Sequence, residues 1–145
     1  MKILVQKFGG SSLATAEARK QAASKIVAAK KMGYSLVVVV SAIGRQGAPY
    51  ATDTLISIAT KENPNLNERE LDLLMSCGEI ISGVLIVATL QKLGYKATCL
   101  TGAQAGIITD GHHGDAHILK IDTDKLKKLL EEGYIVVVTG FQGIT

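Results

Sequence analysis

Tryptophan is absent from the 145-residue sequence, and phenylalanine and tyrosine raise the aromatic content to only 4%. Proteins that stack nucleic-acid bases do so on aromatic rings. Sixteen basic and thirteen acidic residues leave a net charge of only +3, so no strongly basic surface is available for a phosphate backbone. We therefore expect no nucleic-acid partner.

Cysteine is also scarce, with only Cys77 and Cys99 in the whole sequence. Two cysteines do not form a disulfide framework, and their scarcity indicates a reducing, cytoplasmic compartment. Cys77 has a glycine neighbour but no adjacent base in the sequence. We therefore expect its thiol to be buried and inert.

Long uninterrupted apolar segments are missing as well. The most apolar run, Ile80–Leu90, contains Ser82, Gly83 and Thr89. It is shorter than the roughly 20 residues that a membrane helix requires. The N-terminus carries only a short apolar run, which is not typical of a signal peptide. We therefore expect no membrane partner.

Short apolar runs alternate instead with longer segments of helical periodicity. We predict strands at 3–5, 36–40, 95–100 and 135–138, and helices ending at Gly33 and spanning 54–60, 67–94 and 123–132. Continuously apolar strands are typical of parallel sheets that helices cover on both faces. The sequence therefore predicts one α/β domain with a mostly parallel sheet.

The segment that begins at Asn67 is the longest predicted helix. Asn67 with Glu70 three residues later is a capping-box pattern, and Gly94 is a natural terminator. Between these residues the segment is apolar on nearly every side. We expect a central, buried helix.

The strongest local signal follows the first predicted strand and reads Lys7-Phe8-Gly9-Gly10-Ser11-Ser12. Two glycines let a backbone turn tightly and bring its N–H groups close to an anion. A following helix, capped by Thr15 or Ser12, would add positive potential at its N-terminus. Lys7 would supply a full charge to phosphate oxygens. The spacing matches neither the P-loop nor the dinucleotide fingerprint, and a plain strand-to-helix turn is the alternative.

Glu79 lies inside the most apolar stretch of the chain. A carboxylate there is costly unless a cation meets it, such as the ammonium group of a ligand. A lysine-paired carboxylate at a helix end is the alternative. The polar stretch 41–53 follows the second strand, where open α/β sheets bind ligands. Thr52 or Asp53 would act there or as the N-cap of the next helix.

Three histidines stand close together, at positions 112, 113 and 117. Two of them are adjacent, and no cysteine or second carboxylate cluster lies at the spacing of metal ligands. We therefore predict no metal site built from protein side chains.

Six segments, in order along the whole chain, resemble aspartate kinases of the amino-acid kinase family. They are KFGGSS (7–12), VVVVSAIG (37–44), ATDTL (51–55), SCGEIIS (76–82), LTGAQAGIITD (100–110) and GFQG (140–143). The resemblance implies a three-layer αβα sandwich around a mostly parallel sheet, with residues 1–145 as the N-terminal, aspartate-side part of the catalytic domain. It implies transfer of the γ-phosphoryl group of Mg-ATP to the β-carboxylate of L-aspartate, on the route to lysine, threonine and methionine.

The resemblance also implies roles for individual residues. Lys7 would be the catalytic cation on the transferring phosphoryl group. The phosphates would be bound by Lys7, Phe8, Gly9, Gly10 and Ser11. Aspartate would be held by Ser41, Thr52 and Glu79, with Glu79 at its α-ammonium group. The attacking carboxylate is already ionised at neutral pH, so the reaction requires no general base.

The substrate could also be that of another amino-acid kinase, such as glutamate 5-kinase, although the SCGE and ATDT segments weigh against this. The family's GRGGSD segment, nucleotide-base pocket and ACT regulatory domains do not lie within residues 1–145. We therefore expect little turnover by this chain alone, and at most weak binding of aspartate or phosphate. We also expect the last strand to leave an open sheet edge, through which the chain forms homo-oligomers.

Overall fold

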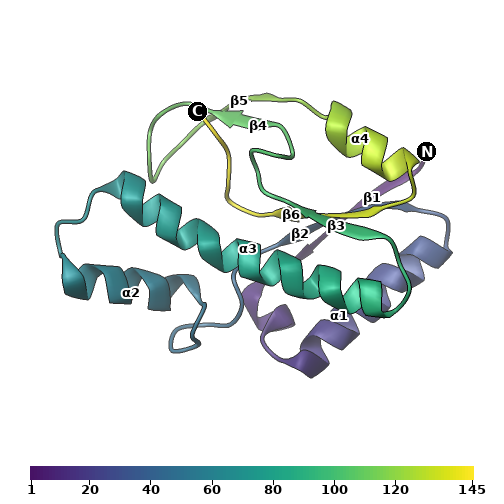
Figure 1. The fold of residues 1–145 in the computed structure, drawn as a ribbon, viewed down its shortest axis with the longest axis horizontal. Coiled ribbons are helices and arrows are strands. Elements are labelled where there is room, and N and C mark those ends of the chain that lie inside the picture. Colours follow the sequence, from purple (N-terminus) through teal and green to yellow (C-terminus); the bar gives the residue numbers. More distant parts are fainter.

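Four parallel strands form the central sheet of the computed structural model, which describes residues 1–145 (Figure 1). In spatial order they are β1 (Ile3–Phe8), β2 (Ser35–Val40), β6 (Ile135–Thr139) and β3 (Ala97–Leu100). All three strand pairs are parallel, as predicted. The expected position of the last strand is wrong, because β6 pairs with both β2 and β3 and is an inner strand. The sheet edges are β1 and β3.

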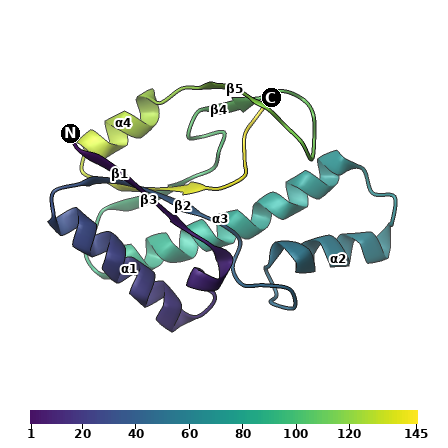
Figure 2. The same cartoon turned by 180° about the vertical axis from the view of Figure 1, so that it is seen from behind.

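Helices cover both faces of this sheet, which gives three layers (Figures 1 and 2). One face carries α1 (Ala16–Lys31) and α3 (Glu68–Lys92), and the other carries α4 (Asp124–Glu131). Side chains alternate along a strand, so β2 serves both layers. The predicted αβα sandwich is therefore confirmed.

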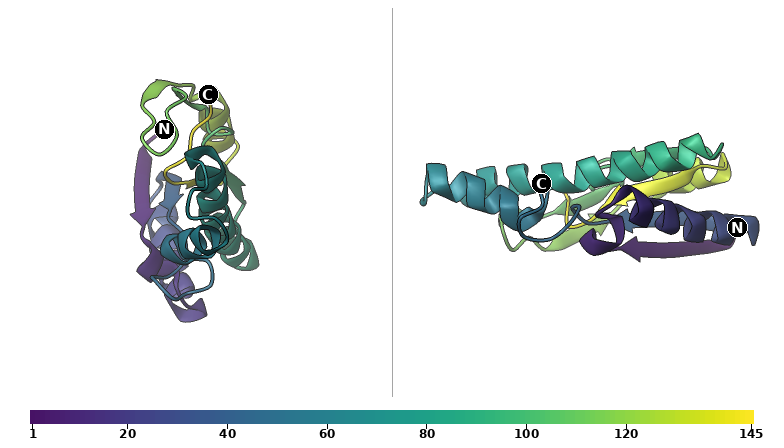
Figure 3. Two further views of the ribbon diagram at one scale, coloured as in Figure 1. Left: turned by 90° about the vertical axis from the view of Figure 1, so that its left-hand side faces the viewer. Right: turned by 90° about the horizontal axis from the view of Figure 1, so that it is seen from below.

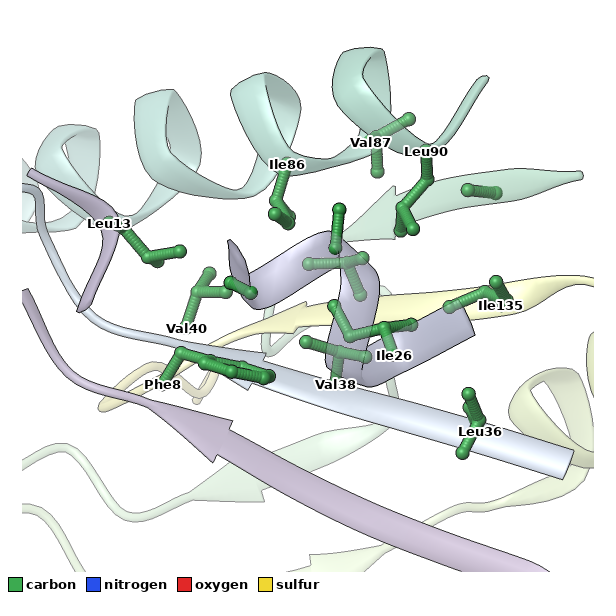
Figure 4. Packing of buried hydrophobic residues seen from close by; sticks show 14 of the residues in the cluster. Phe8, Leu13, Ile26, Leu36, Val38, Val40, Ile86, Val87, Leu90 and Ile135 are labelled. Carbon is green, nitrogen blue, oxygen red and sulfur yellow. The ribbon is translucent and has the colours of Figure 1, made fainter. Parts of the chain in front are cut away.

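The larger core cluster lies between the sheet and the pair α1 and α3 (Figure 4). Leu36, Val38 and Val40 of β2 meet Ile26 of α1 and Ile86 of α3, and all five are fully buried. Burial of each such side chain stabilises the fold by about 1.5–3 kcal/mol. A smaller cluster on the opposite face packs α4 against β2 and β6.

The remaining elements extend the molecule beyond the sheet. A 3-10 helix, η1 (Gly10–Leu13), follows β1, and α2 (Thr52–Glu62) packs against α3. An antiparallel hairpin joins β4 (Ile107–Thr109) to β5 (Ile118–Ile121), and residue 144 bridges to β4. Figure 3 shows that α3 runs along the long axis and reaches past the sheet to α2.

Local sequence patterns correctly predicted several of the helix ends. The Asn67 side chain accepts a hydrogen bond from the Glu70 N–H at 3.0 Å, as the capping pattern predicts. Glycines at positions 33, 94 and 133 follow three of the helices with φ of 91°, 85° and 87°. Only glycine adopts this left-handed conformation without steric cost, so these residues end the helices.

Full burial of α3 is not observed. Its residues at 78, 79, 82, 83, 86, 87 and 90 are buried, whereas Leu73 and Val84 on the outer side are 60% and 52% exposed. The helix is long and apolar enough, by length and composition, to cross a membrane. Its buried face packs against β3 and β6 as that of a core helix does. Cys77 also lies on the outer side, so its predicted burial is wrong.

Candidate active site

A broad cleft of about 1330 Å³ opens where the strands of the sheet end. This exceeds the roughly 300–1,000 Å³ of a typical small-molecule pocket, so the cleft has room for more than one ligand. Four predicted site residues line it: Gly10, Ser41, Thr52 and Glu79. Gly10 and Ser41 follow β1 and β2, whose carboxyl ends lie at one edge of the parallel sheet. Thr52 begins α2 and Glu79 lies within α3.

Glu79 is the buried acidic group of this cleft. Only 5% of the residue is exposed, and none of the close contacts between basic and acidic side chains involves it. Burial raises the pKa of the Glu79 carboxyl above its ordinary value of 4.5, although backbone N–H groups of Glu79 and Ala42 oppose the shift. Glu79 is therefore a largely buried acidic group with no basic side chain within 4 Å of its carboxylate.

The turn after β1 packs directly on the turn after β2. The Gly44 N–H donates to the Gly10 carbonyl at 3.0 Å, and the Ser41 N–H donates to the Phe8 carbonyl at 3.2 Å. A Cβ at Gly10 would lie 2.5 Å from the carbonyl oxygens of both Ala42 and Gly44. Gly10 is thus required for close packing of the two turns.

Gly9 differs from its neighbour, because a Cβ there would meet nothing within 4 Å. Gly9 and Ser11 are exposed, whereas the side chain of Phe8 is buried in the core. Only the backbone of Phe8 can therefore face a ligand. The predicted N-cap Thr15 is confirmed, because α1 begins at Ala16 and the Thr15 hydroxyl accepts a hydrogen bond from the Ala18 N–H at 3.0 Å. The N-terminus of α1 lies beyond η1, however, and not directly at the two glycines.

Lys7 is exposed near the end of β1 and points its ammonium at Phe141. The distance from the Lys7 Nζ to the centroid of the Phe141 ring is 5.0 Å. Phe141 lines the cleft that Glu79 also lines. Lys7 itself is not among the residues that line the cleft, but its contact with Phe141 places its ammonium beside one of them, at the cleft margin.

Thr52 begins α2 and lines the cleft. The alternative role predicted for Thr52 or Asp53, as the N-cap of this helix, is wrong: Ala51 occupies the N-cap and no side chain caps the helix. The Thr52 hydroxyl is therefore not committed to the helix end. Together with Ser41, it offers a neutral hydrogen-bonding group in the cleft that Glu79 also lines.

The hairpin loop between β4 and β5 forms another wall of the cleft. Asp110 accepts hydrogen bonds from the N–H groups of His112 and His117 at 3.1 and 3.2 Å, and both imidazoles approach it. Burial acts to raise the pKa of Asp110, but these contacts outweigh it and lower the pKa to about 2. Asp72 of α3 accepts from the Gly114 N–H at 2.8 Å, which ties the loop to α3.

No group of three or more His, Cys, Asp or Glu side chains in the chain is arranged to hold a metal ion. Asp110 does gather His112 and His117, but through hydrogen bonds within the loop. Besides Glu79, Ser41 and Thr52, charged residues line the cleft, namely Asp53, Asp72, Asp110, Asp115, Arg45 and Arg69.

Two residues of the GFQG segment belong to the site without having been assigned a role from the sequence. Phe141 contacts Lys7, and the Gln142 side chain bridges Thr139 of β6 and the Ser76 carbonyl of α3. The segment is visible in the sequence as a motif. Its contacts with Ser76 and Lys7 join residues 66 or more positions apart, which no local pattern reveals.

A model of the amino acid kinase family matches residues 2–145. Across all 145 residues the chain is 48% identical to aspartokinase 1 of Bacillus subtilis and 46% identical to an aspartokinase of Mycobacterium bovis. It covers 36% and 33% of those proteins, so it spans about a third of the length of these curated relatives.

Solved structures show the same similarity. Aspartate kinase from Synechocystis matches with a TM-score of 0.80 and 43% identity over 99% of this chain and 22% of that one. Aspartokinase III of E. coli, solved in complex with aspartate and ADP, matches with a TM-score of 0.68 and 21% identity. That match covers 98% of this chain and 41% of the other, and it shows a shared fold.

Proposed function

Because this chain belongs to the amino acid kinase family, we propose that the protein acts as an aspartate kinase. The reaction transfers the γ-phosphoryl group of ATP to the β-carboxylate of L-aspartate and forms 4-phospho-L-aspartate. The identity of 46–48% to proteins named aspartokinase supports this substrate over glutamate or acetylglutamate. Since the chain spans about a third of those relatives, the activity is proposed for the protein to which these residues contribute.

The proposal rests on the burial of Glu79 without a basic side chain in contact with it. A buried carboxylate in a cleft with room for ligands, and with no basic side chain within 4 Å of it, is matched by a ligand that brings its own positive charge. The α-ammonium group of an amino acid is such a charge. Ser41 and Thr52 line the same cleft and supply hydroxyls that would orient the remainder of the substrate.

The phosphate side of the reaction is proposed for the turn after β1. Lys7 provides the cation that neutralises charge on the transferring phosphoryl group, and its place at the cleft margin fits an anion entering from solvent. Gly9 leaves open space on the Cβ side, so phosphate oxygens can approach the backbone there. The backbone of Phe8, Gly10 and the exposed Ser11 complete the proposed phosphate turn.

Catalysis in this site would consist of placement and charge neutralisation. The β-carboxylate of aspartate is already ionised at neutral pH, so no residue has to remove a proton. Glu79, by holding the ammonium end, would fix where the β-carboxylate lies relative to Lys7. In-line placement of this kind supplies much of the rate enhancement in phosphoryl transfer.

ATP is the proposed phosphoryl donor, with Mg²⁺ bound to its phosphates. Mg²⁺ commonly keeps several waters and binds through substrate phosphates rather than a dedicated protein cage. The residues present fit that arrangement, because they offer no three-residue metal site. The two free cysteines fit a reducing compartment, and we propose the cytoplasm, where the product would enter synthesis of lysine, threonine and methionine.

Calorimetric titration of this chain with L-aspartate tests the proposal. We expect weak binding by the wild type and an affinity reduced about tenfold or more in Glu79→Gln, because the ammonium group loses its charged partner. Glu131→Gln is the matched control, since Glu131 is exposed on α4, outside the cleft. Equal aspartate affinity in all three proteins would contradict the proposal.

A coupled assay of ADP release separates binding from catalysis. For this chain alone we expect no aspartate-dependent turnover, and for the protein with the full catalytic domain we expect turnover that Glu79→Gln abolishes. A preference of that protein for glutamate or acetylglutamate over aspartate would replace the proposed substrate while leaving the phosphoryl-transfer site in place.

A further inference from the structure

Phe141 has an unfavourable backbone conformation and an exposed aromatic side chain. It is the only residue other than glycine with a positive φ, at 57°, and it is 85% exposed. A bulky side chain in the left-handed region is strained, and an exposed aromatic ring loses the benefit of burial. Glycine at this position would avoid both costs, so the ring itself needs an explanation.

The contact with Lys7 supplies that explanation. The Lys7 ammonium lies 5.0 Å from the ring centroid, within the roughly 6 Å at which a cation is attracted to an aromatic face. Phe141 follows β6, and β2 separates β6 from β1. The ring therefore reaches across the end of β2 to meet a side chain on β1.

The turn that carries Phe141 is held from several directions. The Gln142 amide accepts from the Thr139 hydroxyl at 2.7 Å and donates to the Ser76 carbonyl at 2.8 Å. The backbone of Gln142 approaches Gly102 so closely that a Cβ there would overlap its carbonyl. The Gly140 N–H donates to the Val40 carbonyl at 2.8 Å. These contacts can maintain a strained residue between them.

We propose that Phe141 is a positioning residue for Lys7, and that its ring holds the ammonium at the margin of the cleft before an anion arrives. A lysine side chain is long and flexible, and an exposed one samples many rotamers. A ring on one side of the ammonium limits that sampling and leaves N–H groups free for phosphate oxygens. The role as phosphate ligand rests on the proposed function, whereas the contact of ring and ammonium does not.

Nuclear magnetic resonance of the side-chain ε-CH2 group of Lys7 tests the contact in this chain. We expect the ring to shift the wild-type signal upfield relative to exposed lysines on α4, such as Lys127. The shift should disappear in Phe141→Leu, which keeps an apolar side chain, and persist in Phe141→Tyr, which keeps the aromatic face. A Lys7 signal that is unchanged in Phe141→Leu would overturn the proposal.

Titration with inorganic pyrophosphate, observed at the same Lys7 signal, tests the consequence. We expect a dissociation constant about two- to fivefold higher in Phe141→Leu than in the wild type, with recovery in Phe141→Tyr. Equal constants in all three proteins would show that the ring does not prepare Lys7 and would overturn the positioning role. If pyrophosphate leaves the wild-type Lys7 signal unchanged, the phosphate-binding role in the proposed function is contradicted. The comparison of ε-CH2 signals would then still show whether the Phe141 ring contacts Lys7.

Phe141→Gly distinguishes positioning from a structural role of the ring. Glycine relieves the backbone strain, so we expect a thermal midpoint equal to or above that of the wild type together with loss of the Lys7 shift. A lower midpoint accompanied by an unchanged Lys7 signal would show that the ring serves the fold and would overturn the proposal.

Discussion

Glu79 is the residue at which stability and proposed function conflict. The fold buries its carboxyl group without a neutralising cation, and burial raises its pKa in the folded state. An ammonium ligand would relieve this cost, so the conflict is what a binding site of this kind predicts. The raised pKa of Glu79 determines whether the folding stability rises or falls with pH.

We predict that Glu79→Gln stabilises the chain at pH 8 and does not at pH 4. The folded carboxyl keeps its proton to higher pH than the unfolded one, whose pKa is near 4.5, so the wild type loses stability as pH rises from 4.5 through the raised pKa. Glutamine has no charge to desolvate. Urea unfolding of both proteins at the two pH values measures the difference, and a gain of the same size at both would contradict the prediction.

The two glycines of the proposed phosphate turn differ in how closely the surrounding backbone packs against them. Gly10→Ala would place a Cβ 2.5 Å from two backbone carbonyl oxygens, so we expect a loss of stability of about 1–3 kcal/mol. Gly9→Ala meets nothing within 4 Å and should change stability by much less. Urea unfolding compares the pair. Equal losses would show that Gly10 does not fit closely between the turns.

At the scale of elements, α3 depends on a cap at its N-terminus. Asn67→Ala removes the acceptor of the Glu70 N–H and should cost about 0.5–2 kcal/mol. Thr123→Ala is the matched control, because Thr123 occupies the N-cap of α4 without a side-chain hydrogen bond. Denaturation midpoints of the two variants should therefore separate. If Thr123→Ala lowers the stability as much as Asn67→Ala does, the effect does not arise from the N-cap hydrogen bond.

The turn after β6 is the element that joins the two sides of the cleft. Through Phe141 it contacts β1, and through Gln142 it contacts α3 one turn before Glu79. The proposed phosphate cation and the proposed ammonium anchor are therefore tied to the same short segment. A change in this turn would displace both ends of the site relative to each other.

At the scale of the whole molecule, β1 leaves one side of the sheet unpaired. It pairs only with β2, and Ile3 and Val5 are 44% and 60% exposed on its open face. An edge strand with exposed apolar side chains favours association with another chain. From the sequence we expected self-association through the last strand, but β6 is an inner strand. We therefore predict that self-association occurs through the edge strand β1.

Size-exclusion chromatography with light scattering over a range of concentrations measures that association. We expect the apparent mass of the wild type to rise with concentration, and Val5→Lys to reduce the rise because a charge on an edge strand opposes pairing. Val84→Lys, which replaces an exposed apolar residue on α3, is the control. A wild type that is monomeric throughout, or an equal effect of both variants, would contradict the prediction.

Much of the fold was predictable because its signals are local. Apolar runs indicated the four parallel strands, and Asn67, Gly33 and Gly94 marked helix ends through contacts within a few residues. Of the predicted site residues, Gly10, Ser41, Thr52 and Glu79 line one cleft, and their roles stay predictions. Their convergence follows from the position of each near the end of a parallel strand or on an adjoining helix.

Composition, periodicity and motifs by themselves determined that this is an α/β protein with a glycine turn, a lysine and an internal glutamate near one sheet edge. Only the tertiary structure decided the strand order that encloses β6, the reason Gly10 must be glycine, and the placement of Phe141 over Lys7. These features depend on segments far apart along the chain, whose contacts exist only once the sheet has assembled. The outer face of α3 is exposed for the same reason, because its burial depends on what packs against it rather than on its own apolar residues.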